Sequence, residues 1–341
     1  MESTQLKNDI PYLATKTEMN LPKIAVTMGD PAGVGPEVCL HLLQNSEIAQ
    51  LCTPVIFGDH EVLVETAKQC NMTEPDRFTG GLGQANSPCI LDIGAITPAA
   101  FETGKINAAT GLASYTYVED AINAALSGQV AAVTTAPINK EALHAAEIFY
   151  PGHTEIFTDL THSHHSCMLQ YSSEVRCVFA TTHVAYSEVP SLLTTNRILE
   201  TLELGAQAMK RLRGGEPKIG VLGLNPHAGE HGLFGAEEET VIIPAINAAR
   251  AKGFDVEGPI PPDTAFLPDK RQETDLFVCM YHDQGHIPLK ALCFDKAVNT
   301  TLGLPIVRTS VDHGTALDIA GQGRANPNSL FEAVKLALKF I

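Results

Sequence analysis

The sequence predicts an α/β protein in which helices cover a parallel or mixed sheet. Short apolar runs, typical of strands, alternate along the chain with segments of helical periodicity. The chain has 341 residues, of which 44% are hydrophobic and 18% charged, so it is long enough for one large or two medium domains. Several strand-like runs also end in polar residues, as strands do where their carboxyl ends form a binding site.

Each element follows from its local pattern. Strands are expected where apolar runs are short, at residues 23–28, 54–57, 130–134, 167–171, 176–180, 219–222, 277–280 and 298–300. Helices are expected at residues 36–43, 61–68, 108–127, a short segment from Asn139, 197–211, 237–251 and 329–340. Gly128 and Gly214 are placed to end two of these helices. Residues 1–21 are polar and mixed, and we expect a disordered tail rather than a signal peptide.

Composition excludes several classes of function. The net charge of −16 disfavours nucleic-acid and anionic-membrane binding. No run approaches the roughly 20 apolar residues that span a bilayer, so we expect a cytoplasmic protein. The eight cysteines have no CxxC spacing and are expected to be small buried side chains rather than metal ligands or disulfides.

Three strand-like runs end in a histidine, and this is the most informative feature of the chain. The runs RCVFATTH, KIGVLGLNPH and LFVCMYH end at His183, His227 and His282. At one sheet edge, three imidazoles could hold a divalent metal and leave positions open for substrate. Nitrogen ligands favour zinc, with magnesium or cobalt as alternatives. Asp283 could orient the neighbouring imidazole of His282.

Two glycine-containing motifs have a functional and a structural interpretation. MGDPAGVGPE, residues 28–37, could present N–H groups to an anion or be a turn between strand and helix, and it lacks the dinucleotide G-x-G-x-x-G spacing. YPGHTE, residues 150–155, is expected to form a turn that leaves His153 and Thr154 side by side. These two suit a polar substrate, although a histidine in a turn is more often a surface or capping residue.

The remaining candidates lie in the last third of the chain. Asp263 in GPIPPDTAF could be a metal ligand, a group beside the ligands or a turn former. Lys290 and Arg308 are expected among apolar residues, where an unpaired charge is costly, so a phosphate, a carboxylate or a salt bridge should accompany them. DHGTALDIAGQGRANP, residues 312–327, is a long polar connection of the kind that is often functional.

These motifs, in this order, resemble those of the 4-hydroxythreonine-4-phosphate dehydrogenase family. The likeness rests on MGDPAGVGPE, TTAPINKEAL, YPGHTE, TTH, GLNPHAGE, PPDTAF, YHDQGH, VNTTLGLPIVRTS and DHGTALDIAG, and it spans roughly residues 22–341. The resemblance implies a fold similar to isocitrate and isopropylmalate dehydrogenases, with two α/β/α lobes and a cleft between them. Lobe 1 would comprise residues 22–145 and 305–341 and lobe 2 residues 146–304.

The resemblance also implies roles for individual residues. His183, His227 and His282 match metal ligands, which in the family come from both subunits of a homodimer. Five residues match substrate contacts: His153, Thr154, Lys290, Asn299 and Arg308. Four belong to a loop similar to the adenosine loop of isopropylmalate dehydrogenases: His313, Gly314, Asp318 and Asn326. Leu317 departs from that loop, because the relatives usually have proline there. Asp263 matches an acid close to the metal, and Asp263, Asp283 and His153 are all candidates for the general base.

The activity implied is oxidation of 4-phosphooxy-L-threonine at C3 by NAD or NADP, with a divalent metal, followed by decarboxylation to 3-amino-2-oxopropyl phosphate for pyridoxal phosphate. A 4-phospho-D-threonate or 4-phospho-D-erythronate dehydrogenase is the alternative within the family, and a dihydrodiol dehydrogenase is a more distant one. A metallohydrolase is the alternative from another enzyme class, and a non-catalytic metal or metabolite sensor has little support.

Overall fold

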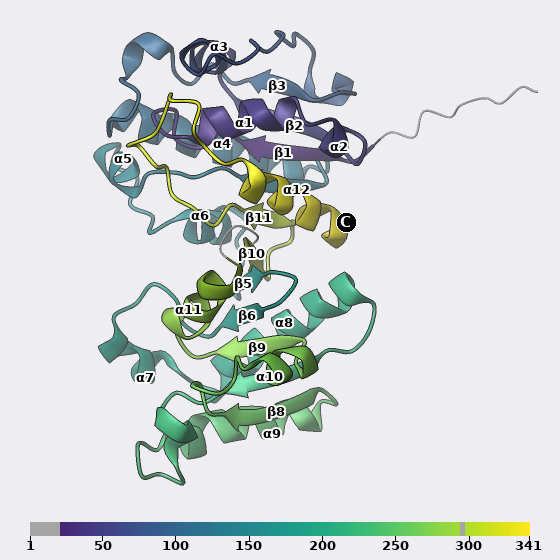
Figure 1. Cartoon of the computed structure of the whole chain (residues 1–341), viewed down its shortest axis with the longest axis vertical. Coiled ribbons are helices and arrows are strands. Elements are labelled where there is room, and N and C mark those ends of the chain that lie inside the picture. Colours follow the sequence, from purple (N-terminus) through teal and green to yellow (C-terminus); the bar gives the residue numbers. More distant parts are fainter. Residues whose placement is uncertain (1–20, 294–296) are drawn as a thin grey trace, which may run out of the picture.

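A single twisted sheet of eleven strands runs the length of the molecule in the order β3-β2-β1-β4-β11-β10-β5-β6-β9-β7-β8. The computed structural model describes residues 21–293 and 297–341, and it has two lobes stacked along the long axis (Figure 1). The expected tail at 1–21 falls almost wholly outside these residues. Within the described ranges, no helix is both long and apolar enough to cross a membrane.

The strands form a parallel group in each lobe. In the upper lobe of Figure 1 these are β1 (Lys23–Thr27), β2 (Thr53–Gly58), β3 (Cys89–Asp92), β4 (Ala132–Thr135) and β11 (Arg308–Ser310). In the lower lobe they are β6 (Arg176–Phe179), β7 (Lys218–Leu222), β8 (Asp255–Ile260) and β9 (Leu276–Cys279). The groups are joined at the waist by β10 (Val298–Leu302) and β5 (Cys167–Tyr171), each antiparallel to its neighbours.

Helices lie on both faces of this sheet. Those in the first half of the chain are α1 (Gly35–Leu43), α2 (Ser46–Ala49), α3 (His60–Gln69), α4 (Ala108–Leu126), α5 (Lys140–Ala145) and α6 (His153–Leu160). The others are α7 (Val189–Leu192), α8 (Thr195–Arg213), α9 (Ile243–Ala251), α10 (Pro268–Glu273), α11 (His282–Cys293) and α12 (Asn328–Phe340). A π-helical turn, Glu238–Ile242, leads directly into α9.

Each lobe has its own apolar core. In the lower lobe, Val178 and Val278 pack beneath α8 and α9, whereas Phe179 and Phe277 point to the opposite face, where Leu289 of α11 packs. This alternation follows from the two-residue period of a strand buried on both faces. The expected α/β class with α/β/α lobes is therefore confirmed.

The division of the chain between the lobes remains a prediction, and the packing adds one detail to it. Ile156 and Phe157 of α6 lie in the core of the upper lobe, although the sequence-based division assigned residues from 146 onward to the other lobe. Helix α12 contributes Val334 to the upper core and Leu336 to the lower one.

Most expected elements are present, and the differences have physical reasons. The turn expected at YPGHTE ends at Gly152, and His153 begins α6. The histidine-rich segment from His282 forms α11, which had not been expected because its apolar periodicity is interrupted by Gly285 and Pro288. All eight cysteines are free and seven of them are buried, as expected.

Candidate active site

A cavity of about 390 Å³ lies where strands from both lobes end. Its walls follow the carboxyl ends of β4 and β11 in one lobe and of β6 and β9 in the other. This is the edge at which open α/β sheets bind ligands. Nine of the residues singled out in the sequence line it: His153, Thr154, His183, His282, Lys290, Asn299, Arg308, His313 and Gly314.

The cavity contains most of the buried polar atoms that lack a partner. Of twelve such side-chain atoms among the described residues, seven belong to residues of this cavity. They are His153 Nε2, Glu155 Oε2, Gln170 Oε1, Asn299 Oδ1, Arg308 Nε, Asp312 Oδ2 and His313 Nε2. Because buried polar groups are normally hydrogen-bonded, this concentration indicates a site shaped for a polar ligand.

Arg308 is the most deeply buried charge in the cavity. It is 1% exposed, and its guanidinium donates to Thr301 Oγ1 and Thr135 Oγ1, each at 2.9 Å, and lies 5.3 Å from the centre of the Phe157 ring. Burial lowers the pKa of Arg308 to about 9, with Glu155 acting in the opposite direction, so the side chain stays charged at neutral pH. A buried cation whose hydrogen bonds in the described structure go to two neutral hydroxyls is suited to bind an anion.

Two imidazoles of the cavity that feel the charge of Lys140 are held in the neutral form. Burial, followed by the charges of Arg308 and Lys140, lowers the pKa of His153 well below its usual value. Burial and then Lys140 also lower the pKa of His183. Neutral imidazoles can accept a proton or donate a lone pair to a metal.

The geometry around His282 suits a metal ligand. The rings of His183 and His282 have centroids 5.7 Å apart, and the Nδ1 atom of His282 lies 2.6 Å from Asp283 Oδ1. Tyr186 donates its hydroxyl proton to the other oxygen of Asp283. Asp283 therefore orients His282 rather than lining the cavity itself.

His227 does not join these two histidines within one chain. It follows β7, which lies beside β9 in the sheet, but it is exposed and does not line the cavity. Within the described ranges, no three histidine, cysteine, aspartate or glutamate side chains form a set that could hold a metal ion. Of the three histidines predicted as metal ligands, the described structure thus brings two, His183 and His282, to this cavity.

The loop that carries His227 has an unusual backbone. Residues 227–232 all have positive φ angles, from 42° to 88°, and four of them are not glycine. Glu238, at 2% exposure, stabilises the loop by accepting from the backbone N–H groups of Leu224 and Asn225 and from the Asn225 side chain. Left-handed backbone is costly for residues other than glycine, and such strain is concentrated at functional sites.

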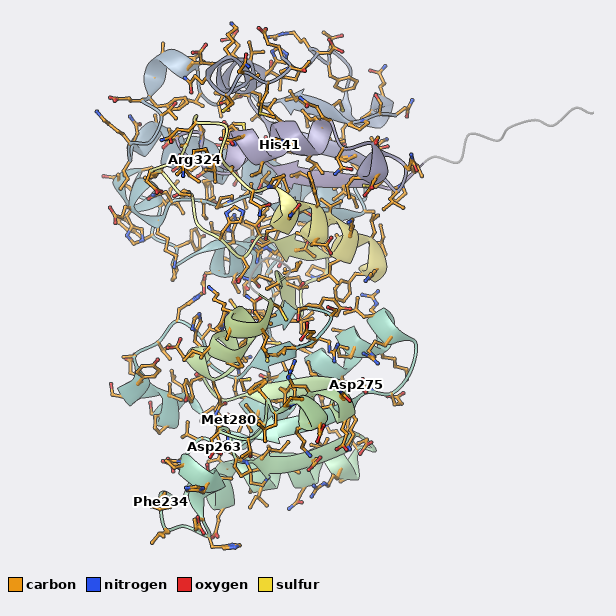
Figure 2. The ribbon with its side chains drawn as sticks, in the orientation of Figure 1. His41, Phe234, Asp263, Asp275, Met280 and Arg324 are labelled. Carbon is orange, nitrogen blue, oxygen red and sulfur yellow. The ribbon has the colours of Figure 1, made fainter. Side chains whose placement is uncertain are left out.

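Asp263 and Asp318 also lie outside the cavity. Asp263 is exposed in the loop after β8, and Figure 2 shows it in the lower lobe away from the waist, as it does Phe234 of the His227 loop. Asp318 is exposed, and its backbone carbonyl accepts from the side chain of Gln322. The structure of a single chain therefore gives no direct support to a role of either residue at this site.

A smaller cavity of about 190 Å³ adjoins the first and shares Asp312 and His313 with it. Asn326 lines it, together with apolar residues that include Val34, Ile319 and Ala325. A small, largely apolar cavity with a few polar side chains is typical of a binding site for a small organic ligand. His313 and Asn326 both line this smaller cavity, and their role toward a dinucleotide remains a prediction.

The glycine loop after β1 has a structural role. The N–H of Gly33 donates to Asp30 O and that of Val34 to Thr315 O, so these groups are not free to bind an anion. A Cβ atom on Gly33 would lie 2.8 Å from Thr315 O. The loop supports the 312–327 segment, which agrees with the structural interpretation of this motif.

Six polar cavity residues were missed by sequence reasoning: Lys140, Glu155, Gln170, His286, Ser310 and Asp312. Lys140, Glu155, His286 and Asp312 lie inside or beside motifs that had been noted, but nothing in their spacing distinguished them. Gln170 is the second-last residue of a strand and had no signal at all. Lys290, expected among apolar residues, is exposed at the cavity rim, with Nζ 3.8 Å from Asp312 Oδ2.

Two α/β lobes with a cavity between them, lined by three cations, two carboxylates and several histidines, define a two-lobed α/β protein with a polar binding site. The family model described as pyridoxal phosphate biosynthetic protein PdxA matches residues 50–337, and the chain belongs to this family. It is therefore an enzyme of a dehydrogenase family, an oxidoreductase.

Individual relatives carry two names. The chain is 41% identical to a 4-hydroxythreonine-4-phosphate dehydrogenase of Desulforapulum autotrophicum, over 93% of this chain and 95% of the relative. It is 42% identical to a D-threonate 4-phosphate dehydrogenase of Cupriavidus necator, over 92% and 96%. A crystal structure of 4-hydroxythreonine-4-phosphate dehydrogenase from Klebsiella pneumoniae has a TM-score of 0.83 and 38% identity, covering 94% of this chain and 98% of that one. The suggested family is confirmed, and the substrate within it is left open between the two names.

Proposed function

We propose that this protein oxidises 4-phosphooxy-L-threonine at C3 with NAD or NADP and then releases carbon dioxide, giving 3-amino-2-oxopropyl phosphate for pyridoxal phosphate. The observation that carries the proposal is the cation-lined cavity at the waist. Arg308, Lys140 and Lys290 supply positive charge for a ligand with two anionic ends. The family description and the Desulforapulum relative support this choice.

The cations of the cavity form two groups. The charges of Arg308 and Lys140 both lower the pKa of His153. This residue begins α6, where the helix N-terminus adds further positive potential. The charge of Lys290 instead acts to lower the pKa values of Asp312 and His286, so Lys290 lies near these two residues. A substrate with a phosphate at one end and a carboxylate at the other would contact both groups.

His153 is our candidate for the group that takes the proton from the C3 hydroxyl. Of the three residues considered for this role, it alone lines the cavity, and its Nε2 atom is buried without a partner. Burial and the nearby cations lower the pKa of His153, so its ring is unprotonated at neutral pH, which is the state a general base must be in before it takes a proton. His183 and His282 would hold a divalent ion, zinc first, which when bound supplies Lewis acidity to the substrate oxygen.

NAD or NADP would occupy the smaller cavity with its adenine end and accept the hydride in the larger one. His313 lines both cavities, so it lies where the two parts of the cofactor would meet.

We also propose a cytoplasmic homodimer with active sites at the subunit interface. The exposed position of His227 supports this arrangement, because the residue is then available to the cavity of a second copy. Large apolar side chains are exposed beside the three histidines, as expected of a surface that a partner covers: Val184, Tyr186, Leu233, Phe234 and Ile287.

D-Threonate 4-phosphate is the second candidate substrate, and the name of the Cupriavidus relative favours it. It keeps the phosphate, the carboxylate and the C3 hydroxyl, and it has a hydroxyl in place of the C2 amine. The cation groups described above do not distinguish the two compounds.

The test is turnover of each compound by metal-stripped protein to which zinc, magnesium or cobalt is returned, with NAD or NADP. We expect reduced nicotinamide and carbon dioxide in equal amounts from 4-phosphooxy-L-threonine. Turnover of D-threonate 4-phosphate alone would transfer the proposal to the second candidate. Hydrolysis without reduction of NAD or NADP would indicate a metallohydrolase and contradict both.

A further inference from the structure

Gln170 is a fully buried residue of the cavity wall, and only the nitrogen end of its side-chain amide has hydrogen-bond partners. It belongs to β5, the strand at the waist, and is 0% exposed. Its Nε2 atom lies 2.9 Å from Asp312 Oδ1 and 3.2 Å from His286 Nε2. Its Oε1 atom is buried without a partner.

The neighbours of Gln170 fix which way its amide points. A carboxylate oxygen has no proton to give, so the amide group must turn its N–H toward Asp312. His286 favours the same orientation of the amide. Its Nδ1 atom lies 3.0 Å from the carbonyl oxygen of His282 and must donate there. In the neutral ring the other nitrogen, Nε2, is then an acceptor and also requires the N–H side of Gln170.

The support for Gln170 is itself rigid. The His286 ring stacks on His282 with centroids 3.8 Å apart, and it packs 4.7 Å from the Phe179 ring. Asp312 follows β11 in the other lobe and lies 3.8 Å from Lys290. Gln170 is therefore held from both lobes, and the direction of the carbonyl oxygen of this cavity-lining residue is fixed before a ligand binds.

The other unpartnered oxygen atoms of the cavity differ from this one. Glu155 and Asp312 are carboxylates whose charges act on cations, Arg308 and Lys290 respectively. The amide oxygen of Asn299 has no partner among the described residues, so nothing described there fixes its direction as Asp312 and His286 fix that of Gln170. Gln170 thus supplies a neutral acceptor whose direction is set before the ligand arrives.

We propose that Gln170 Oε1 selects substrates that carry a hydrogen-bond donor at C2, and that Asp312 and His286 are its positioning residues. The inference rests on the proposed function. In such a substrate the phosphate and carboxylate offer only acceptors at neutral pH, and the C3 hydroxyl is the reacting group. The substituent at C2, an amine or a hydroxyl, is the remaining donor. A site built around a buried acceptor rejects an analogue that lacks the donor, because the acceptor is then left unpaired.

The experiment compares kcat/KM for three substrates with an amine, a hydroxyl or hydrogen at C2: 4-phosphooxy-L-threonine, D-threonate 4-phosphate and 3-hydroxy-4-phosphooxybutanoate. We expect the wild type to prefer one or both donor-bearing compounds over the 2-deoxy compound. Gln170→Met removes the acceptor at similar size and should reduce this preference by about 10- to 100-fold. Gln170→Glu should shift the preference toward the amine, because a carboxylate favours an ammonium partner.

Two further variants make the result decisive. Asp312→Asn supplies a side-chain donor that lets the Gln170 amide turn round, so it should also reduce the preference, even if Gln170→Met does not fold. Gln207→Met makes the same change at an exposed site on α8, outside this cavity, and should leave the preference unchanged.

Equal losses of kcat/KM on all three substrates in both Gln170→Met and Asp312→Asn would show that the network is only structural and overturn the inference. A wild type that oxidises all three substrates equally would also overturn it while leaving the dehydrogenase function in place. A wild type that oxidises none of them would remove the proposed function itself.

Discussion

Arg308→Lys tests the assignment of Arg308 as an anion contact. Lysine keeps the positive charge but loses the planar fork that reaches Thr301 and Thr135 and the Nε–H that is free in the cavity. A hydrogen bond to a charged group contributes about 1.5–3 kcal/mol. Loss of one such bond to the substrate should therefore raise KM for the phosphorylated substrate about 10- to 150-fold.

The assay is initial-rate kinetics at the reduced-nicotinamide absorption band, with substrate and NAD varied separately. We expect KM for NAD to change by less than about threefold, since Arg308 does not line the smaller cavity. Arg176→Lys is the matched control. Arg176 is a buried arginine of β6, 7% exposed, whose guanidinium donates to the carbonyl oxygens of Ser173, Thr274 and Asp275 rather than lining the cavity. It should cost stability without altering KM. Equal changes in the two KM values of Arg308→Lys would refute the anion-contact role.

Three other changes test separate parts of the structure. His227→Ala should weaken metal binding about tenfold or more while the circular dichroism spectrum is unchanged, because the side chain is exposed; full activity in metal-stripped buffer would argue against the ligand role. Glu238→Ala leaves the part-buried N–H groups of Leu224 and Asn225 without this partner and should lower the free energy of unfolding by about 1–3 kcal/mol in denaturant titrations, so a loss under about 0.5 kcal/mol would contradict its role in the loop. Burial lowers the pKa of His286 to about 4, so the unfolded chain binds a proton there between about pH 6.5 and 4 while the folded one does not. As pH falls over that range, the free energy of unfolding of the metal-free protein should decrease by up to about 3 kcal/mol. The decrease should be smaller in His286→Asn, and an identical pH profile in the two proteins would contradict this.

The strand-end histidines show how far the sequence alone could go. The runs before His183, His227 and His282 are correctly predicted as strands, and β6, β9 and β7 are neighbours in the sheet. The sequence could not show that His227 turns away from the other two. That outcome depends on six consecutive left-handed residues and on Glu238, which lies eleven positions further on and accepts hydrogen bonds beneath the loop.

The cavity residues that sequence reasoning missed share a cause. Gln170 and Asp312 are 142 positions apart and become neighbours only because β10 joins β5 to β11 across the waist. Local patterns of hydrophobicity contain no information about such strand order. β11 is only three residues long and all polar, so no apolar run marks the strand that carries Arg308.

The most direct test of the central claim is a comparison of 4-phosphooxy-L-threonine with the same compound lacking its phosphate. The cavity has three cations for a ligand with two anionic ends, so with NAD and a divalent metal the account predicts rapid formation of reduced nicotinamide from the phosphorylated compound. It predicts at least a hundredfold lower kcat/KM for 4-hydroxythreonine, in line with the loss of one or two charge-assisted hydrogen bonds. Equal kcat/KM for the two compounds, or no reduced nicotinamide from either of them or from D-threonate 4-phosphate, would contradict the account.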